Sequence, residues 1–186
     1  MKVPKKQSIT AITDHKVVGK ISNNAHDKKK YSQSLKRSLS RLIAVQALYQ
    51  YDFYERNISI VEMTKQMTDN YFLSDKEELA TSYQDKIDNN LLETLTSGVI
   101  LVLPNLDSEI KLWLKNEWKI ENLLDVMLAI LRLATFELNF IKDTPKTVII
   151  SEYVDLAACF YDIKQVTFVN SILQNITNKA GEHVAS

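Results

Sequence analysis

The sequence is poor in residues that form tight turns or cross-link a chain, with three glycines, three prolines and one cysteine among its 186 residues. So few turn residues argue against a sandwich or barrel of many short strands and against a glycine-rich phosphate loop. A single cysteine, Cys159, cannot form an internal disulfide and fits the reducing cytoplasm. The run Leu91–Val102 is interrupted by Glu93 and is too short to cross a bilayer, so we expect no transmembrane helix.

Patterns typical of catalytic and metal sites are also missing from the sequence. The histidines (His15, His26 and His183) are scattered and form no cluster with cysteine or carboxylates at metal-ligand spacing. Cys159 has no local histidine partner and is predicted to be a buried, unreactive thiol. The serines stand in no G-x-S-x-G context, and no pair of carboxylates is set apart for acid–base chemistry. The sequence therefore predicts a protein that is not an enzyme and needs no cofactor or metal.

The formal net charge of zero conceals an uneven distribution of charge along the chain. Residues 1–41 hold eleven cations and two anions, a net charge of +9, whereas the other 145 residues hold twelve cations and twenty-one anions, a net charge of −9. A basic arm on an acidic body is typical of nucleic-acid binding, but a solvated tail that only maintains solubility has the same composition. The predicted organisation is a disordered basic extension over 1–33, a helical domain over 34–180 and a tail over 181–186.

Hydrophobic residues recur at helical spacing through the body of the chain, which predicts about seven helices and no sheet. The expected landmarks are N-caps at Ser34 and Asp107, a stop at Pro104, a cap at Thr144 followed by Pro145, a helix within 58–70, and a last helix over Val166–Lys179. Leu124–Ile141 is apolar around most of its circumference and is predicted to be the buried centre. Its Arg132 is expected to close a partly buried polar contact, with Glu137 close to pairing distance. Gly98 lies inside a helix and predicts a close helix crossing there.

The first expected helix carries two arginines one turn apart. Arg37 and Arg41 lie roughly opposite the helical face formed by Leu35, Leu39 and Leu42. Two guanidinium groups on a surface turned away from the core suit adjacent phosphates, because each presents a planar fork of donors. An ordinary solvated helix face has the same spacing, so the two arginines alone leave both interpretations open.

Two segments together resemble a known family. Residues 37–53 read RSLSRLIAVQALYQYDF, and residues 129–173 contain AILRLATFEL, a loop with Asp143 and Pro145, TVIISEYVDLAACF and FVNSIL. These motifs resemble the NusB family of transcription antitermination factors, in which an arginine-rich helix start runs into A-V-Q-A-L-Y and A-I-L-R-L-A-x-Y-E-L precedes F-V-N-G-V-L. The resemblance covers roughly residues 34–178.

The resemblance implies an all-α, non-enzymatic protein of two packed helical bundles. It also implies binding to the boxA element of ribosomal RNA transcripts as a heterodimer with NusE, a small-subunit ribosomal protein, within an RNA polymerase complex that contains other Nus factors. Single-stranded RNA is recognised by neutralising its backbone and stacking its bases. The residues expected to contact RNA are Lys36, Arg37, Arg41, Lys164 and Phe168. The F-V-N setting of Phe168 fits a core position equally well.

The chain departs from the family pattern at several positions. The arginine run of the first helix is thinned, and family members usually have glycine and an acidic residue where this chain has Tyr161 and Lys164. The glycine of F-V-N-G is Ser171, and two apolar residues, Met127 and Leu128, precede AILR. If Met127 and Leu128 are exposed, they favour a homodimer.

Two other functions stay open at this point. NusB-like domains also precede the methyltransferase domain of ribosomal RNA cytosine methyltransferases, although the sequence leaves no room for a cofactor-binding domain after the last motif. A helical protein-interaction module, with an acidic body that binds a basic partner, would need no RNA selectivity. Strong NusE binding without a preference among RNA sequences would favour this second alternative.

Overall fold

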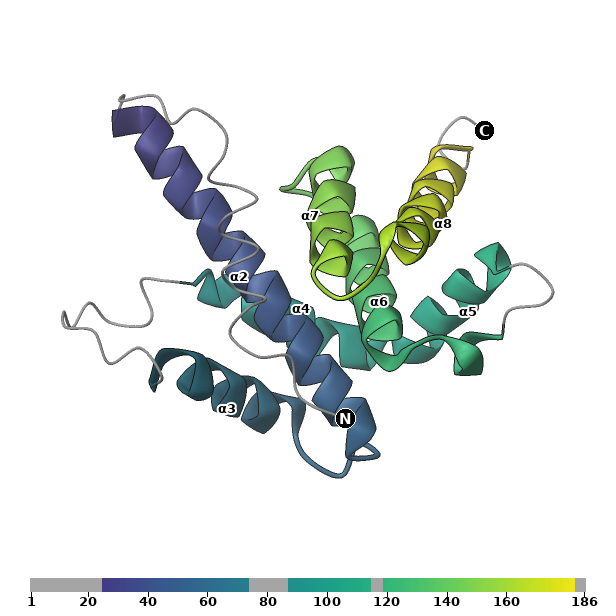
Figure 1. The fold of residues 1–186 in the computed structure, drawn as a ribbon, viewed down its shortest axis with the longest axis horizontal. Helices are drawn as coiled ribbons and strands as arrows, with labels where there is room; N and C mark the ends of the chain where they lie inside the picture. Colours follow the sequence, from purple (N-terminus) through teal and green to yellow (C-terminus); the bar gives the residue numbers. More distant parts are fainter. Residues whose placement is uncertain (1–24, 74–86, 115–118, 183–186) are drawn as a thin grey trace.

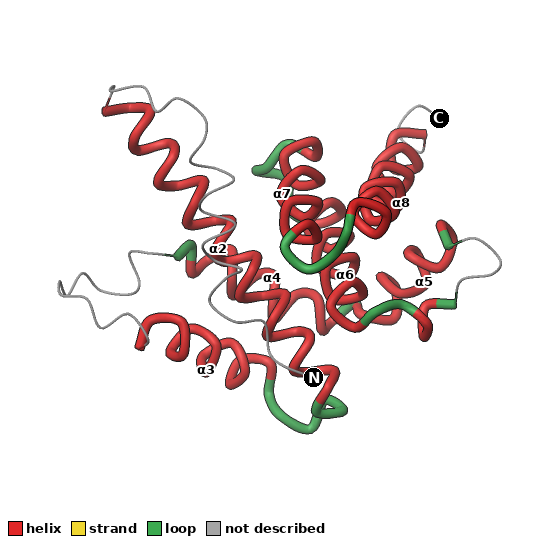
Figure 2. Tube along the Cα trace, in the orientation of Figure 1, coloured by secondary structure: helices red, strands yellow, loops and turns green. Residues whose placement is uncertain are grey.

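The computed structural model describes residues 25–73, 87–114 and 119–182, and this part of the chain contains seven α-helices, one 3-10 helix and no strand (Figure 1 and Figure 2). The helices are α2 (Ala25–Phe53), α3 (Ile60–Leu73), α4 (Asn89–Leu101), α5 (Leu103–Trp113), the 3-10 helix η2 (Ile120–Asn122), α6 (Asp125–Phe140), α7 (Lys146–Ala158) and α8 (Ile163–Glu182). The predicted all-α fold is confirmed. None of these helices is both long and apolar enough to cross a membrane.

The helices pack as two bundles that share one core (Figure 1). Helices α2, α3 and α4 contact one another in the first bundle, and α5, α6, α7 and α8 form the second. Helix α6 contacts both α2 and α4, and the buried apolar side chains of the two bundles make a single cluster. The two-bundle arrangement implied by the family resemblance is therefore confirmed.

The centre of the fold is helix α6, as its apolar sequence predicts. Every residue from Ala129 to Leu138 is buried. The segment 41–48 of α2 is buried around its whole circumference as well, because α3, α4, α6 and α7 all contact this helix. A helix that is covered on every side must also bury its polar residues, and these require partners.

Arg132 of α6 is one such residue, and its partners differ from the expected one. Its Nε and Nη2 donate to the two carboxylate oxygens of Asp107 in α5, at 2.6 and 2.7 Å, and its Nη1 pairs with Asp52 of α2. The expectation that Arg132 closes a buried polar contact is confirmed. The suggested pairing with Glu137 is wrong, because Glu137 is held by Arg41 instead. Arg132 thus ties α2 and α5 to the central helix.

Helix α2 begins at Ala25, nine residues before the expected cap at Ser34. The Ser34 carbonyl accepts a hydrogen bond from Ser38 Oγ, which places it within the helix. Residues 25–33 lack a hydrophobic face, yet a helix extends readily once its first turn has formed, and lysine and glutamine are good helix formers. Residues 25–33, which were predicted to be disordered, are therefore part of helix α2. The rest of it, residues 1–24, lies outside the described residues.

Three other expected boundaries are shifted. The segment expected to stop at Pro104 ends at Leu101, and Pro104 itself stands in the first turn of the next helix, α5, where its missing N–H costs nothing. Asp107 is inside α5 and is engaged with Arg132 rather than capping a helix. At α7 the N-cap is Pro145, one residue later than predicted, which leaves the hydroxyl of Thr144 available to another helix.

The close crossing predicted at Gly98 is confirmed. A Cβ built on Gly98 would lie 2.2 Å from Cζ and 2.8 Å from Cε2 of Phe136 in α6. Contacts this short do not occur between real atoms, so any larger residue would force the ring to move. Glycine therefore lets α4 approach the central helix, and the N-cap of α4, Asp88, lies beside Arg37.

Candidate nucleic-acid interface

Arg37 of α2 is the more accessible of the two arginines expected to bind RNA. Its side chain is 26% exposed. One nitrogen, Nη2, donates to Thr144 Oγ1 at 2.6 Å, and Nη1 lies 3.5 Å from Asp88 Oδ2. The contact to Asp88 is weak, because its atoms are 3.5 Å apart and the pair is still partly open to water. Arg37 is therefore held in position by Thr144, with part of its guanidinium free to approach an anion.

Arg41 is buried, contrary to the expectation that it faces outward. The residue is 2% exposed. Its Nε and Nη2 donate to Oε2 and Oε1 of Glu137 at 2.9 and 2.6 Å, and its Nη1 donates to Glu152 Oε2 at 3.3 Å. The interpretation of Arg41 as a phosphate contact is thus wrong, because α6 and α7 cover the face of α2 that the local pattern had suggested was free.

The acids around Arg41 complete a polar network between three helices. Ser38 Oγ donates to Glu152 Oε2 at 2.6 Å, and Tyr153 OH donates to Glu137 Oε2 at 3.0 Å. Burial disfavours the charged guanidinium, but its hydrogen bonds and the nearby carboxylate of Glu137 outweigh burial and raise the pKa of Arg41. Burial raises the pKa of Tyr153, and Glu137 adds to the effect. The network fixes α2 against α6 and α7, one turn beyond Arg37.

The other expected RNA contacts lie on two separate parts of the surface. Lys36 is half-buried beside Arg37. Lys164 is exposed in the first turn of α8, where its backbone N–H donates to Asp162 Oδ1 at 2.9 Å. Phe168, one turn further along α8, is half-buried and packs against the core. Its position is intermediate between the core and surface alternatives that the sequence left open.

These two parts stand at opposite ends of α7. Arg37 contacts Thr144 just before the helix, and Lys164 follows its far end after a short turn. Helix α7 has 13 residues, which corresponds to a length of about 20 Å. The structure therefore does not bring Lys36 and Arg37 together with Lys164 and Phe168 into one site. A ligand that reaches both must be an extended chain.

Two departures from the family pattern prove to be in contact with each other. Burial raises the pKa of Tyr161 to about 12, although a hydrogen bond with the backbone of Met127 opposes that rise. Tyr49 of α2 and Asp125 also lie near the phenol. Met127 itself is buried, so the exposed apolar patch that would have favoured a homodimer is not formed by this residue. A tyrosine in place of glycine is half-buried and packs against the core beside α6.

Sequence reasoning missed the residues that surround Arg37. Asp88 was not singled out, and Thr144 had been assigned to a helix cap. Phe140 had been counted with a buried helix, yet it is 55% exposed at the end of α6. No local pattern distinguishes it, because α6 is apolar on every side. Among the described residues, no group of three or more histidines, cysteines or acids is placed to hold a metal ion.

Comparison with known proteins assigns the chain to a family. A family model described as "NusB family" matches residues 38–178, which include both motif segments except the first residue of the earlier one. The chain belongs to the NusB family. Lys36 and Arg37 lie immediately before the matched range, whereas Arg41, Lys164 and Phe168 lie within it.

Individual NusB proteins agree with this assignment. The transcription antitermination protein NusB of Brucella anthropi is 36% identical over 141 residues, which cover 76% of this chain and 81% of that protein. The structure of T. maritima NusB superposes with a TM-score of 0.62 and 29% identity, over 76% of this chain and 90% of that one. A chain from the crystal structure of antitermination factors NusB and NusE in complex with dsRNA has a TM-score of 0.61, 24% identity and coverage of 76% and 96%, which shows a shared fold.

Proposed function

We propose that this protein is a transcription antitermination factor that binds the boxA element of ribosomal RNA operon transcripts together with NusE and suppresses termination. The observation that carries the proposal is membership of the NusB family over residues 38–178, with curated relatives named as antitermination proteins. A protein of the same fold has been crystallised with NusE and RNA. The proposed role is binding rather than catalysis, within an RNA polymerase complex that contains other Nus factors. Because bacterial transcription is cytoplasmic, we place the protein there.

The proposed RNA contacts are four of the five residues singled out from the sequence. Lys36 and Arg37 would neutralise phosphates at one end of α7, and Lys164 and Phe168 would contact the strand at the other end. Arg41 is left out, because it is enclosed by Glu137 and Glu152. The two groups stand at opposite ends of α7, a helix about 20 Å long, and this arrangement suits an extended single strand, whose phosphates and unstacked bases can be held at several points.

Fluorescence anisotropy of a labelled boxA-type RNA, with and without NusE and beside a base-scrambled control, tests this function. We expect the boxA-type RNA to bind more tightly than the scrambled one and NusE to tighten binding further. Equal binding of both RNAs with no gain from NusE would contradict the proposal. Tight NusE binding with no selectivity between RNAs would instead favour the protein-interaction module.

A further inference from the structure

A pocket of about 440 Å³ opens beside Arg37, between α2, α4 and the segment that joins α6 to α7. The pocket is formed by residues far apart in the sequence, including Arg37, Asn90 and Phe140. Its volume suits a small ring system rather than a long side chain or a single ion. Because Arg37 is already proposed to contact RNA, a ligand in this pocket would be continuous with the bound strand.

Phe140 supplies an aromatic platform in this pocket. Its ring is 55% exposed and lies against the ring of Phe136, with the two centroids 5.1 Å apart and the planes tilted by 31°. Phe136 is buried and packs beside Gly98, so it supports Phe140 from the core side. An exposed aromatic ring that is fixed from behind offers its free surface for stacking.

The rim of the pocket is polar and carries both signs of charge. Asn90 and Thr94 are exposed one turn apart on α4, where an amide and a hydroxyl can donate to and accept from the edge of a base. Lys142 joins Arg37 as a second cation, and the carboxylates of Asp88 and Asp143 balance the two cations. A phosphate inside the pocket would be repelled by both carboxylates. A neutral base would not be repelled, and the phosphates on either side of it could stay near the two cations.

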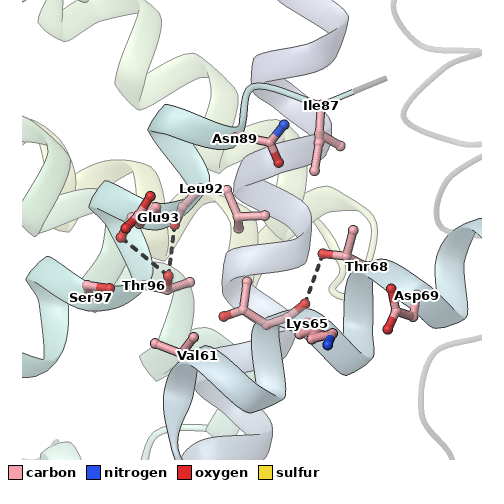
Figure 3. A pocket seen from close by; sticks show the side chains of 11 residues that line it. Val61, Lys65, Thr68, Asp69, Ile87, Asn89, Leu92, Glu93, Thr96 and Ser97 are labelled. Carbon is pink, nitrogen blue, oxygen red and sulfur yellow. Dashed lines mark hydrogen bonds between the residues drawn. The ribbon is translucent and has the colours of Figure 1, made fainter. Parts of the chain in front are cut away.

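A second pocket, which lacks both an aromatic ring and an arginine, serves as a comparison. It measures about 500 Å³ between α3 and α4, and its lining includes Val61, Lys65, Asp69 and Glu93 (Figure 3). This lining contains neither an aromatic ring nor an arginine. Although it is the larger of the two pockets, it has no surface on which a base could stack.

We propose that the pocket beside Arg37 holds one unstacked nucleobase of the bound RNA, stacked on Phe140, with Arg37 and Lys142 on the adjoining phosphates. The inference rests on the proposed RNA-binding function and adds a base-binding subsite to it. The base is recognised by stacking and by Asn90 and Thr94 at its edge, and the cations hold the backbone at the mouth of the pocket.

The test combines a protein variant with RNAs that lack single bases. Phe140→Ala is expected to weaken binding of the boxA-type RNA about 5- to 150-fold, the range found when one base loses an aromatic partner. An abasic site introduced at each RNA position in turn should weaken binding to the wild type. At one position this abasic penalty should vanish in Phe140→Ala, since the same contact cannot be lost twice. Phe140→Tyr, which keeps the aromatic face, should retain binding.

Phe53→Ala is the matched control, because Phe53 is 65% exposed at the far end of α2 and does not line this pocket. Equal affinities of Phe140→Ala and Phe53→Ala, or abasic penalties that are unchanged in Phe140→Ala at every position, would overturn the subsite while leaving the proposed function intact. Loss of NusE binding without loss of RNA affinity would make Phe140 a protein contact and would also overturn it. Failure of the wild-type protein to prefer boxA-type RNA would overturn the proposed function itself.

Discussion

At the scale of single residues, Arg37 and Arg41 share a helix and a residue type but not an environment. Arg37 is partly exposed against Thr144 and Asp88, whereas Arg41 is enclosed by Glu137 and Glu152. The spacing between the two arginines is that of any pair on a helix face. The acids that bury Arg41 lie 96 and 111 residues further along the chain. No argument from the local sequence could therefore separate a ligand-binding arginine from a structural one.

Replacing Arg41 by alanine is expected to lower the free energy of unfolding by about 3–5 kcal/mol, because Glu137 would stay buried without its partner. The same change at Arg37 should cost about 1 kcal/mol or less, since its ion pair is partly exposed. Urea unfolding followed by far-ultraviolet circular dichroism measures both. A loss of unfolding free energy at Arg41 as small as the one expected at Arg37 would show that the Arg41 network contributes little to stability. Arg37→Ala should stay folded and lose affinity for RNA.

Tyr161 gives the stability of the protein a dependence on alkaline pH. Because its pKa is raised from 10.0 to about 12 in the fold, the folded state holds the phenol proton more tightly than the unfolded chain does. Its contribution is therefore complete below pH 10 and is lost as the pH rises through 12. Tyr161→Phe cannot ionise and should flatten the decline in stability above pH 10.

Urea midpoints measured at several pH values between 8 and 12 test this expectation. Tyr153, whose pKa is also raised, should leave a residual slope in both proteins. Tyr54→Phe, at an exposed position, is the control variant. Parallel curves for Tyr161→Phe and the wild type would rule out a contribution from the Tyr161 phenol.

At the scale of helices, periodicity predicted which segments are helical but not where each begins. The β-branched run Val148–Ile150, whose composition favours a strand, lies within helix α7. The start of α2 was missed because residues 25–33 have no hydrophobic face. Caps failed where a polar residue had a tertiary partner, as Asp107 does in Arg132. Where a capping residue also has a partner on another helix, the contact with that partner determines its position rather than the local capping signal.

The crossing of α4 and α6 predicts the effect of a substitution at Gly98. Alanine there would gain about 1 kcal/mol in helix propensity, but its Cβ would collide with the buried ring of Phe136. Overpacking of this kind costs about 1–3 kcal/mol, so Gly98→Ala should be destabilising overall by about 1 kcal/mol in urea unfolding.

A second substitution tests the origin of that cost. Phe136→Leu removes the atoms in collision, so adding Gly98→Ala to Phe136→Leu should cost less than adding it to the wild type. Additive effects in this double-mutant cycle, or stabilisation by Gly98→Ala alone, would mean that the ring moves aside without cost.

At the scale of the whole molecule, the proposed RNA contacts form two separate groups, and salt dependence can count them. Lys36→Gln and Lys164→Gln should each reduce the slope of log affinity against log salt concentration by about 0.7, the value for one phosphate on a single strand. Because α7 lies between the two groups, the double variant should lose about 1.4. Anisotropy titrations at four or more salt concentrations give the slopes.

Lys111→Gln is the control for this series, since Lys111 is exposed on α5 and pairs with Glu121. Its slope should equal that of the wild type. An unchanged slope for Lys164→Gln would remove this residue, which replaces a commonly acidic one, from the RNA footprint. A change for Lys111→Gln as large as that for Lys36→Gln would indicate that overall charge, rather than position, drives binding.

The sequence by itself determined that the protein is all-helical, that α6 is its centre and that it resembles the NusB family, because helical periodicity and ordered motifs are properties of consecutive residues. Only the tertiary structure decided that Arg41 is internal, that Arg132 joins Asp52 and Asp107, and that Arg37 contacts Thr144, at the end of α7 opposite to Lys164. These facts depend on contacts between helices that are distant in the chain. The spacing of residues along one helix does not show such a contact, because the polar partner of each side chain lies on a different helix.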